Sequence, residues 1–166
     1  MLSNEKKRMK RLCSNANGRL ATNNNVDLSC YGSDSVTPES VTKALAKPFR
    51  TQFDILVVKF TEDYNHCTTC GIRPAICISS TELNKRGPLL TVIPMTKSMQ
   101  YVDKLTHVFI DYKDCEGLEA SGVAMAEQPH CIDRTQAIKK IGKITDVNLQ
   151  KKVMKAVTTA LGMEGQ

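Results

Sequence analysis

The chain has 166 residues, a formal net charge of +6, no tryptophan and seven cysteines. No apolar run approaches the roughly 18 residues that span a bilayer, and no apolar segment of a secretory signal follows the basic N-terminus, so we expect neither a membrane protein nor a secreted one. An odd cysteine count without such a signal also argues against a disulfide framework. We therefore expect a cytoplasmic protein with one domain and an extension.

Residues 1–36 are rich in Asn, Ser, Lys and Arg and show no sustained hydrophobic period, which predicts a basic, disordered tail. Residues 1–50 hold nine lysines and arginines against four acidic residues, whereas residues 51–166 hold fourteen against thirteen. Any binding of a polyanion after residue 50 must therefore come from local placement of charge. A solvated tail and an arm that contacts RNA both fit the basic run at residues 5–11.

Residues 37–50 are predicted to form a short helix and a linker. Thr37 can cap the helix, Pro38 fits its first position and Pro48 stops it. The apolar stripe of this helix would consist of Val41, Ala44 and Leu45.

From residue 51 the pattern changes to short apolar runs at 53–60, 74–79, 89–95, 106–111 and 121–126. Turn signals separate them, among them residues 84–88. Five or six strands at this spacing predict a small, mostly antiparallel barrel. A helix closes the chain: Thr145 or Asp146 can cap it, Gly162 can end it, and its apolar stripe is Leu149, Val153, Val157 and Leu161.

Short motifs follow one another in a specific order through residues 51–163. They include Gly71-Ile72-Arg73-Pro74, Leu83-Asn84-Lys85-Arg86, Val92-Ile93-Pro94-Met95-Thr96 and Glu127-Gln128-Pro129, with further pieces at 54–58, 107–110, 121–124, 132–133, 141–146 and 161–162. In this order they resemble the MazF/PemK family of bacterial toxins, which are mRNA endoribonucleases. The resemblance implies an SH3-like barrel with a terminal helix, a homodimer, cleavage of single-stranded RNA without a metal or other cofactor, and a cognate antitoxin.

The resemblance assigns catalysis to Arg73, Thr96 and Glu127. Cleaving RNA without a metal uses the neighbouring 2′-OH as the nucleophile, so the protein must align that oxygen, stabilise charge on the phosphate and move protons. Arg73 matches the family's catalytic arginine and can grip two phosphate oxygens. Thr96 matches the catalytic threonine, whose hydroxyl can donate to the phosphate or orient the 2′-OH. Glu127 matches an acidic residue assigned as the base in some relatives, and it could equally orient Arg73.

Three further residues are candidates for contacts with RNA. His66 matches a histidine that contacts RNA in some relatives, Lys97 follows Thr96 directly, and Gln128 could read a base edge. Plainer alternatives stay open: an incidental loop histidine, a solvated lysine and an amide that satisfies its own turn. Arg73 could likewise bond to loop carbonyls, and Thr96 to its own turn.

The segment before Arg73 departs from the family pattern. It reads His66-Cys67-Thr68-Thr69-Cys70, where the family usually has Glu, Gln and Gly, so RNA specificity and activity are open there. Free thiols, a redox-sensitive pair or a metal site all fit Cys67 and Cys70, but zinc would need two more ligands, and we expect no metal. Met125 stands where some relatives have a second arginine.

Two other functions stay open. A gyrase inhibitor resembling CcdB would have the same fold but would end in Trp-Gly-Ile, whereas this chain has no tryptophan and ends Met163-Glu164-Gly165-Gln166. A catalytically silent barrel that binds RNA or a partner is the second, and the altered segment before Arg73 favours it.

Overall fold

The structure is a computed structural model that describes residues 38–60, 68–99 and 104–163. The chain divides into two compact units, residues 1–43 and 44–166. The first helix of the described residues, α2, spans Pro38–Leu45 and buries Val41 and Ala44, two of the three residues of its expected stripe. The tail predicted at residues 1–36 lies outside the described residues. In the described part of the chain, no helix is both long enough and apolar enough to cross a membrane.

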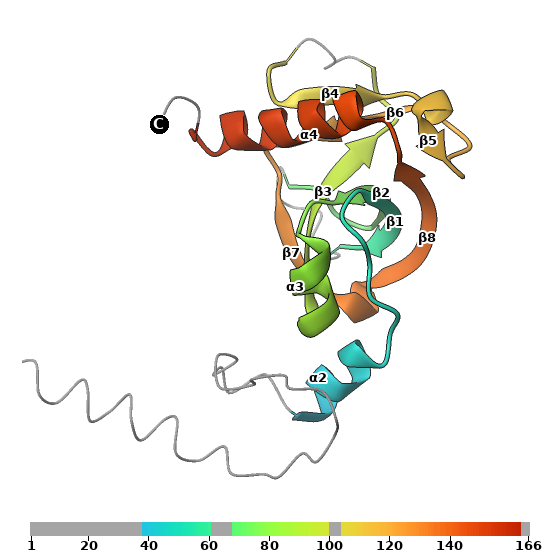
Figure 1. Ribbon diagram of the computed structural model, residues 1–166, viewed down its shortest axis with the longest axis vertical. Helices are drawn as coiled ribbons and strands as arrows, with labels where there is room; N and C mark the ends of the chain where they lie inside the picture. The colour runs from blue at the N-terminus through green and yellow to red at the C-terminus, as the bar shows by residue number, and fades with distance from the viewer. Residues whose placement is uncertain (1–37, 61–67, 100–103, 164–166) are drawn as a thin grey trace, which may run out of the picture. The chain divides into compact units, whose positions relative to one another are not determined.

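All the strands of the described chain belong to the second unit and form one antiparallel, curled sheet (Figure 1). Its order is β4-β6-β3-β2-β1-β8-β5, with β7 paired to β3. The strands are β1 (Asp54–Lys59), β2 (Ile72–Cys77), β3 (Leu89–Thr96), β4 (His107–Ile110), β5 (Cys115–Glu116), β6 (Gly122–Met125), β7 (His130–Asp133) and β8 (Ala137–Ile144). The expected fold class, a small, mostly β, SH3-like antiparallel barrel with a C-terminal helix, is confirmed, and the curled sheet forms a half-barrel.

The strand β3 changes partners along its length, and this change curls the sheet. Its first half pairs with β7, its middle pairs with β2, and its last two residues pair with β6. Gly122 allows the last pairing, because a Cβ there would lie 3.0 Å from the carbonyl oxygen of Thr96. The end of β3 is therefore held between β2 on one side and β6 on the other.

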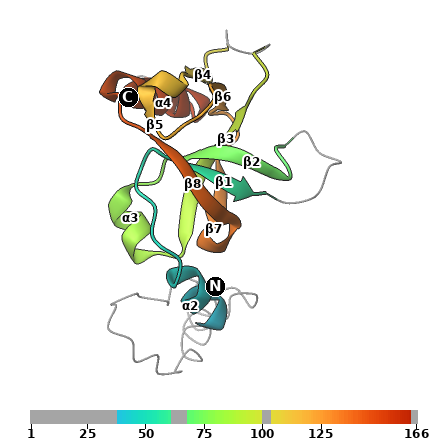
Figure 2. The same ribbon diagram turned by 90° about the vertical axis from the view of Figure 1, so that its right-hand side faces the viewer.

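The strand β8 runs along β1 and continues to β5 (Figure 2). Its register against β1 shifts twice, between Ile55 and Leu56 and between Val57 and Val58, and such irregularities bend a strand. Gly142 lies where the chain after β5 presses on β8: a Cβ at this position would be 3.0 Å from the carbonyl oxygen of Glu116. Gly117 and Leu118 are therefore packed against β8 at Ile141 and Gly142.

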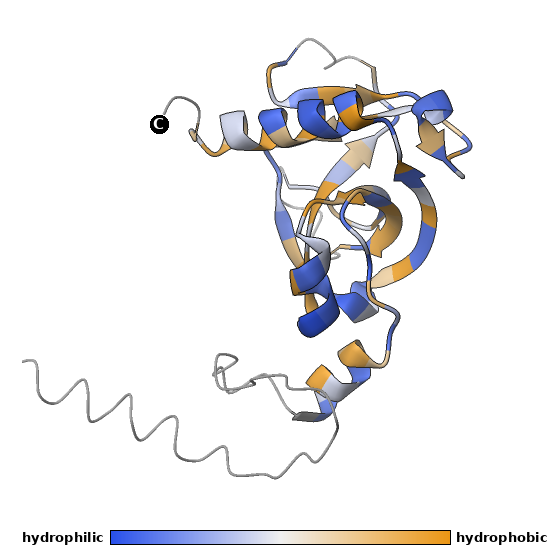
Figure 3. Ribbon diagram, viewed as in Figure 1, coloured by the Kyte–Doolittle hydropathy of each residue, from blue (hydrophilic) through white to orange (hydrophobic). Residues whose placement is uncertain are grey.

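Both faces of the curled sheet are buried, and the alternation of side chains along β1 shows this. Ile55 belongs to a core cluster that also contains the helix α4 (Val147–Ala160), whereas Leu56 belongs to a second cluster with residues of β2, β3, β7 and β8. Hydrophobic and hydrophilic segments alternate along α4, as expected for a helix with one face on the sheet (Figure 3).

The ends of α4 agree with the sequence prediction, but its last stripe position does not. The Asp146 side chain accepts a hydrogen bond from the N–H of Leu149 (2.7 Å), and Gly162 follows the helix at a φ of 68°. Leu149, Val153 and Val157 are buried, but Leu161 is 56% exposed because it already caps the helix. The stripe therefore ends one turn earlier than predicted.

A second difference concerns the turn expected at residues 84–88. The chain forms a short helix there, α3 (Thr81–Arg86), with Ser80 as its N-cap and Gly87 after its last turn. Asn84 points inward from this helix and bonds to Arg50 and Ser79, which attaches the helix to the rest of the unit. Two 3₁₀ turns, η2 (Tyr112–Asp114) and η3 (Arg134–Gln136), complete the described elements.

Candidate functional site

The pairing of β2 with β3 brings Arg73 and Thr96 to the same end of the sheet. Ala75 lies opposite Pro94 and Ile76 opposite Ile93. The pairing ends at Ala75 and Pro94. Arg73 lies two residues before Ala75 and Thr96 two residues after Pro94, so both stand at the same end of the antiparallel pair. The fold therefore places at one end of the sheet both the arginine and the hydroxyl that were named from the sequence.

Arg73 is exposed, and one atom of its side chain is fixed. Its Nε donates a hydrogen bond to the carbonyl oxygen of Cys70 at 3.1 Å. In the described part of the chain, its two terminal nitrogens have no hydrogen-bond or ion-pair partner. The side chain is thus oriented by the loop before β2, while the end of the guanidinium stays open for a ligand such as a phosphate.

Thr96 is half-buried at the C-terminal end of β3. Its Oγ1 accepts a hydrogen bond from the backbone N–H of Ser98 at 3.1 Å, which leaves the hydroxyl hydrogen free to donate elsewhere. The predicted bond between Thr96 and its own turn is therefore present, but it uses only the acceptor side of the hydroxyl. Lys97, the next residue, is exposed.

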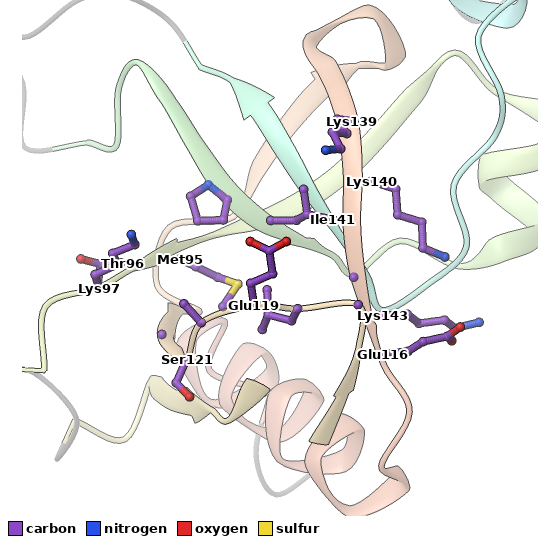
Figure 4. A pocket seen from close by; sticks show the side chains of 16 residues that line it. Met95, Thr96, Lys97, Glu116, Glu119, Ser121, Lys139, Lys140, Ile141 and Lys143 are labelled. Carbon is purple, nitrogen blue, oxygen red and sulfur yellow. The ribbon is translucent and has the colours of Figure 1, made fainter. Parts of the chain in front are cut away.

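Thr96 and Lys97 line a cavity of about 630 Å³ between the ends of β2 and β3, the segment 116–122 and the strand β8 (Figure 4). Met95 and Ile141 contribute apolar surface to it. Its charged residues are of both signs: Lys97, Lys139, Lys140, Lys143, Glu116 and Glu119. The Glu119 side chain reaches into the middle of the cavity, while Lys140 is bound to the buried carboxylate of Asp54 at 2.7 Å.

Glu127 lies in the turn after β6, and a buried histidine holds its carboxylate. His107 Nε2 lies 2.7 Å from Glu127 Oε1; the histidine side chain is 2% exposed and the glutamate side chain 35%. Partial burial raises the pKa of Glu127, but hydrogen bonds from His107, from the backbone and from Thr106 outweigh it, so the pKa lies below its ordinary value. Glu127 is therefore an ionised carboxylate at neutral pH.

Gln128 connects this turn to the loop before Arg73. Its Oε1 accepts two hydrogen bonds from Thr69, one from the backbone N–H (2.9 Å) and one from the hydroxyl (2.8 Å). Thr69 is next to Cys70, whose carbonyl oxygen holds Arg73. The side-chain oxygen of Gln128 therefore holds the loop before Arg73, and its amide nitrogen remains for the base contact that the sequence suggested for this residue.

Residues 51–163 match the sequence profile of a family described as PemK-like, MazF-like toxins of type II toxin–antitoxin systems. This stretch is more than half of the chain. The chain belongs to the PemK/MazF toxin family. A search of curated proteins found no match.

Solved structures of similar fold include members of this family. MazF from Deinococcus radiodurans superposes with a TM-score of 0.59 at 20% identity, over 70% of this chain and all of that one. An endoribonuclease from Mycobacterial species gives a TM-score of 0.56 at 15% identity, over 72% of this chain and 97% of that one. A MazE–MazF complex from D. radiodurans gives 0.55 at 18% identity, over 71% and 100%. At these identities the likeness shows the fold.

The PemK/MazF fold gathers most of the residues named from the sequence. Arg73, Thr96 and Lys97 stand at one end of β2 and β3, and the turn with Glu127 and Gln128 joins them through Thr69. Glu127 is bonded to His107 and has no ion pair with Arg73 among the described contacts. His66 and Cys67 lie outside the described residues, and Cys70 is a free thiol.

Sequence reasoning missed His107 as a site residue. It lies in a run that was predicted correctly as a strand, and its partner Glu127 is twenty positions further on. The pairing of His107 with Met125 across β4 and β6 brings the two side chains together. The one available signal was a polar residue at the start of an apolar strand.

Proposed function

We propose that this PemK/MazF-family chain is the toxin of a type II toxin–antitoxin system and cleaves single-stranded mRNA without a metal. One observation carries the proposal: the antiparallel pairing of β2 and β3 puts Arg73 at the same end of the sheet as Thr96, which lines a cavity of about 630 Å³. The terminal nitrogens of Arg73 have no partner among the described residues. A cation and a hydroxyl donor at one end of a sheet can together bind one phosphate group. The fold likeness to proteins described as endoribonucleases supports the same activity.

In the proposed reaction, the 2′-OH of the substrate attacks the adjacent phosphorus. The O2′–P bond forms, the P–O5′ bond breaks, the 2′ oxygen loses a proton and the 5′ oxygen gains one, which gives a 2′,3′-cyclic phosphate and a 5′-OH end. Arg73 stabilises the charge on the phosphate oxygens, and it is a poor acid because an arginine pKa exceeds about 12. Thr96 donates to the same phosphate or orients the 2′-OH, and Glu127 accepts the proton.

Partners follow from the same proposal. Two similar structures are described as complexes, an endoribonuclease with its cognate antitoxin and MazE with MazF. We propose that a cognate antitoxin binds this chain, that the active form is a homodimer, and that the protein acts in the cytoplasm, where mRNA is found. Lys97 supplies a phosphate contact, and the amide nitrogen of Gln128 supplies a base contact.

The test is to incubate the purified protein with structured and with unstructured RNA in EDTA and to measure cleavage. The variant Arg73→Ala and the control Arg86→Ala are assayed in the same way. Arg86 is an exposed arginine on α3, away from the cavity. We expect wild type and Arg86→Ala to cut unstructured RNA and to leave cyclic phosphate ends, and Arg73→Ala to be ~10²–10³-fold slower. RNA that stays intact but bound would favour a catalytically silent barrel. Equal cleavage by Arg73→Ala would contradict the role of Arg73.

A further inference from the structure

A buried histidine lies beneath the carboxylate that the proposed reaction uses as its base. His107 is the first residue of β4, and its side chain is 2% exposed. Its partner Glu127 is the part of the pair that solvent reaches, at 35% exposure. Burying a polar ring is costly unless it is hydrogen-bonded, so the contact at 2.7 Å between them is a built feature of the fold.

We propose that His107 is a positioning residue for catalysis. It holds the Glu127 carboxylate in place and in its ionised form, beside the loop that precedes Arg73. The inference rests on the proposed function and deepens it. His107 does not contact the RNA and acts only through Glu127.

The backbone around the pair supports a fixed geometry. His107 pairs with Met125 across β4 and β6, and the N–H of Ala126 donates to the carbonyl oxygen of Thr106 at 2.9 Å. These contacts lock the start of β4 to the turn that carries Glu127. The next residue of that turn, Gln128, holds Thr69. The turn that carries the carboxylate is therefore held on one side by the start of β4 and on the other by Thr69, in the loop before Arg73.

The chemistry of the pair suits a base. In the tautomer with hydrogen on Nε2, His107 donates to Oε1 of the ionised carboxylate, and Thr106 adds a second hydrogen bond. The backbone adds a third hydrogen bond. A carboxylate has about four acceptor positions, so three donors still leave room for the proton of the substrate 2′-OH. That proton moves to Glu127 while His107 keeps its own. The histidine is unchanged after the step.

Other charged groups near the pair provide the controls. Asp114, Asp146, Lys152 and Lys155 line a cavity that His107 also lines. Lys104 precedes β4 and accepts a hydrogen bond from the His107 backbone through its carbonyl oxygen. His130, on β7, bonds to the carbonyl oxygen of Gln128 at 2.8 Å. A general effect of nearby charge would appear on changing Lys155, whereas a specific effect requires the donor of His107.

The experiment compares the pH profile of kcat/KM for wild type, His107→Gln, His107→Leu and the control Lys155→Gln. A glutamine can place an amide N–H near the position of Nε2, whereas leucine fills the space without a donor. The pKa of Glu127 is lowered in the folded protein, so wild-type cleavage should persist to low pH and fall only as the carboxylate is protonated. Loss of the donor raises that pKa.

We therefore expect the acid limb of His107→Leu to move to higher pH, with a loss at about pH 5 at least ~10-fold larger than the loss at about pH 7.5. His107→Gln and Lys155→Gln should follow the wild-type profile. In a Glu127→Gln background, His107→Leu should have no further effect on the profile. A loss for His107→Leu that is equal at every pH would mean a purely structural role and would overturn the proposal.

A second measurement needs neither RNA nor a folded leucine variant. NMR titration of the wild-type protein follows the Glu127 side-chain carboxyl carbon and the His107 ring nitrogens together. We expect the ring nitrogens to respond at the pH where the carboxyl titrates, and His107→Gln to leave the carboxyl titration near its wild-type position. Ring nitrogens of His107 that show no response at the pH where the Glu127 carboxyl titrates would overturn the proposal. A wild-type protein that cuts no RNA would refute the proposed function, and the titration would still decide whether His107 controls Glu127.

Discussion

Asn84 shows at the scale of one residue why a polar side chain is buried in this fold. It is fully buried on α3, its Nδ2 donates to the carbonyl oxygens of Arg50 (3.0 Å) and Ser79 (3.1 Å), and its Oδ1 accepts from the Ser79 hydroxyl (2.6 Å). We expect Asn84→Leu to lower the free energy of unfolding by about 3 kcal/mol, because several buried groups lose their partners at once.

Urea denaturation measures this change, and Asn148→Leu is the matched control. Asn148 is exposed in the first turn of α4, so the same substitution there should change stability by about 0.5 kcal/mol or less. Equal effects at the two positions would show that the hydrogen bonds of Asn84 do not stabilise the fold.

The thiols differ in reactivity for a physical reason that can be tested residue by residue. Burial, with help from Asp114 and Asp111, raises the pKa of Cys115 to about 11, and burial also raises the pKa of Cys77. The thiolate is the reactive form, so both groups are unreactive at neutral pH and gain reactivity only as the pH rises. Cys131 is exposed.

We expect iodoacetamide to label Cys131 in the native protein and to label Cys77 and Cys115 only after unfolding. Peptide mapping by mass spectrometry at several times of reaction gives the order. Native labelling of Cys115 at the rate of Cys131 would contradict the burial that the structure gives it.

At the scale of elements, the sequence predicts those strands whose apolar residues are continuous. Five such runs correspond to β1, β2, β3, β4 and β6. The strand β8 was not predicted as a strand, because its sequence has Lys139 and Lys140 in succession and Gly142 near its end. Its side chains do not alternate regularly because the register against β1 shifts twice. Local pattern cannot reveal a strand that is defined by its partner.

The candidate site also has a part that the sequence predicts and a part that it does not. Arg73 and Thr96 were accessible from the sequence because each adjoins an apolar run in a recognisable motif: Arg73 directly precedes the run at 74–79, and Thr96 directly follows the run at 89–95. The bond of Glu127 to His107 and that of Gln128 to Thr69 were not, because each joins residues from different elements. The role of a side chain could be predicted where its neighbours in the sequence form a motif. It was missed where the role depends on a contact with a residue far away in the sequence.

Gln128 carries the prediction that belongs to this scale, because it joins the turn after β6 to the loop before β2. We expect Gln128→Leu to remove the acceptor of Thr69, to speed hydrogen exchange at the Thr69 amide and to slow RNA cleavage by ~10-fold or more through misplacement of Arg73. Gln128→Glu keeps an oxygen acceptor and should keep the Thr69 amide protected.

The two variants also separate the two roles of Gln128. If its amide nitrogen contacts a base, Gln128→Glu should change the preferred cleavage sequences while the loop stays protected. If hydrogen exchange at the Thr69 amide is unchanged in Gln128→Leu, the side chain of Gln128 does not hold the loop before Arg73. The readouts are amide exchange by NMR and sequencing of the cleavage products.

For the whole molecule, the question is whether RNA is held by net charge or by placed charges. Most of the excess charge lies before residue 51, and the remaining chain is nearly balanced. The lysines of the cavity are nevertheless grouped, at Lys97, Lys139 and Lys143, with Lys140 already committed to Asp54. A balanced surface with grouped lysines can still bind a phosphate backbone locally.

The dependence of binding on salt decides between these two possibilities. Each phosphate contact to a single strand contributes about 0.7 to the slope of log K against log salt. With 2′-O-methyl RNA, which cannot be cleaved, we expect Lys139→Gln with Lys143→Gln to reduce the slope by about 1.4. The matched pair Lys151→Gln and Lys152→Gln, on the exposed side of α4, removes the same net charge and should leave the slope nearly unchanged. If both pairs lowered the slope equally, RNA would be responding to the net charge of the molecule, and the cavity beside Thr96 would not be the path of the RNA backbone.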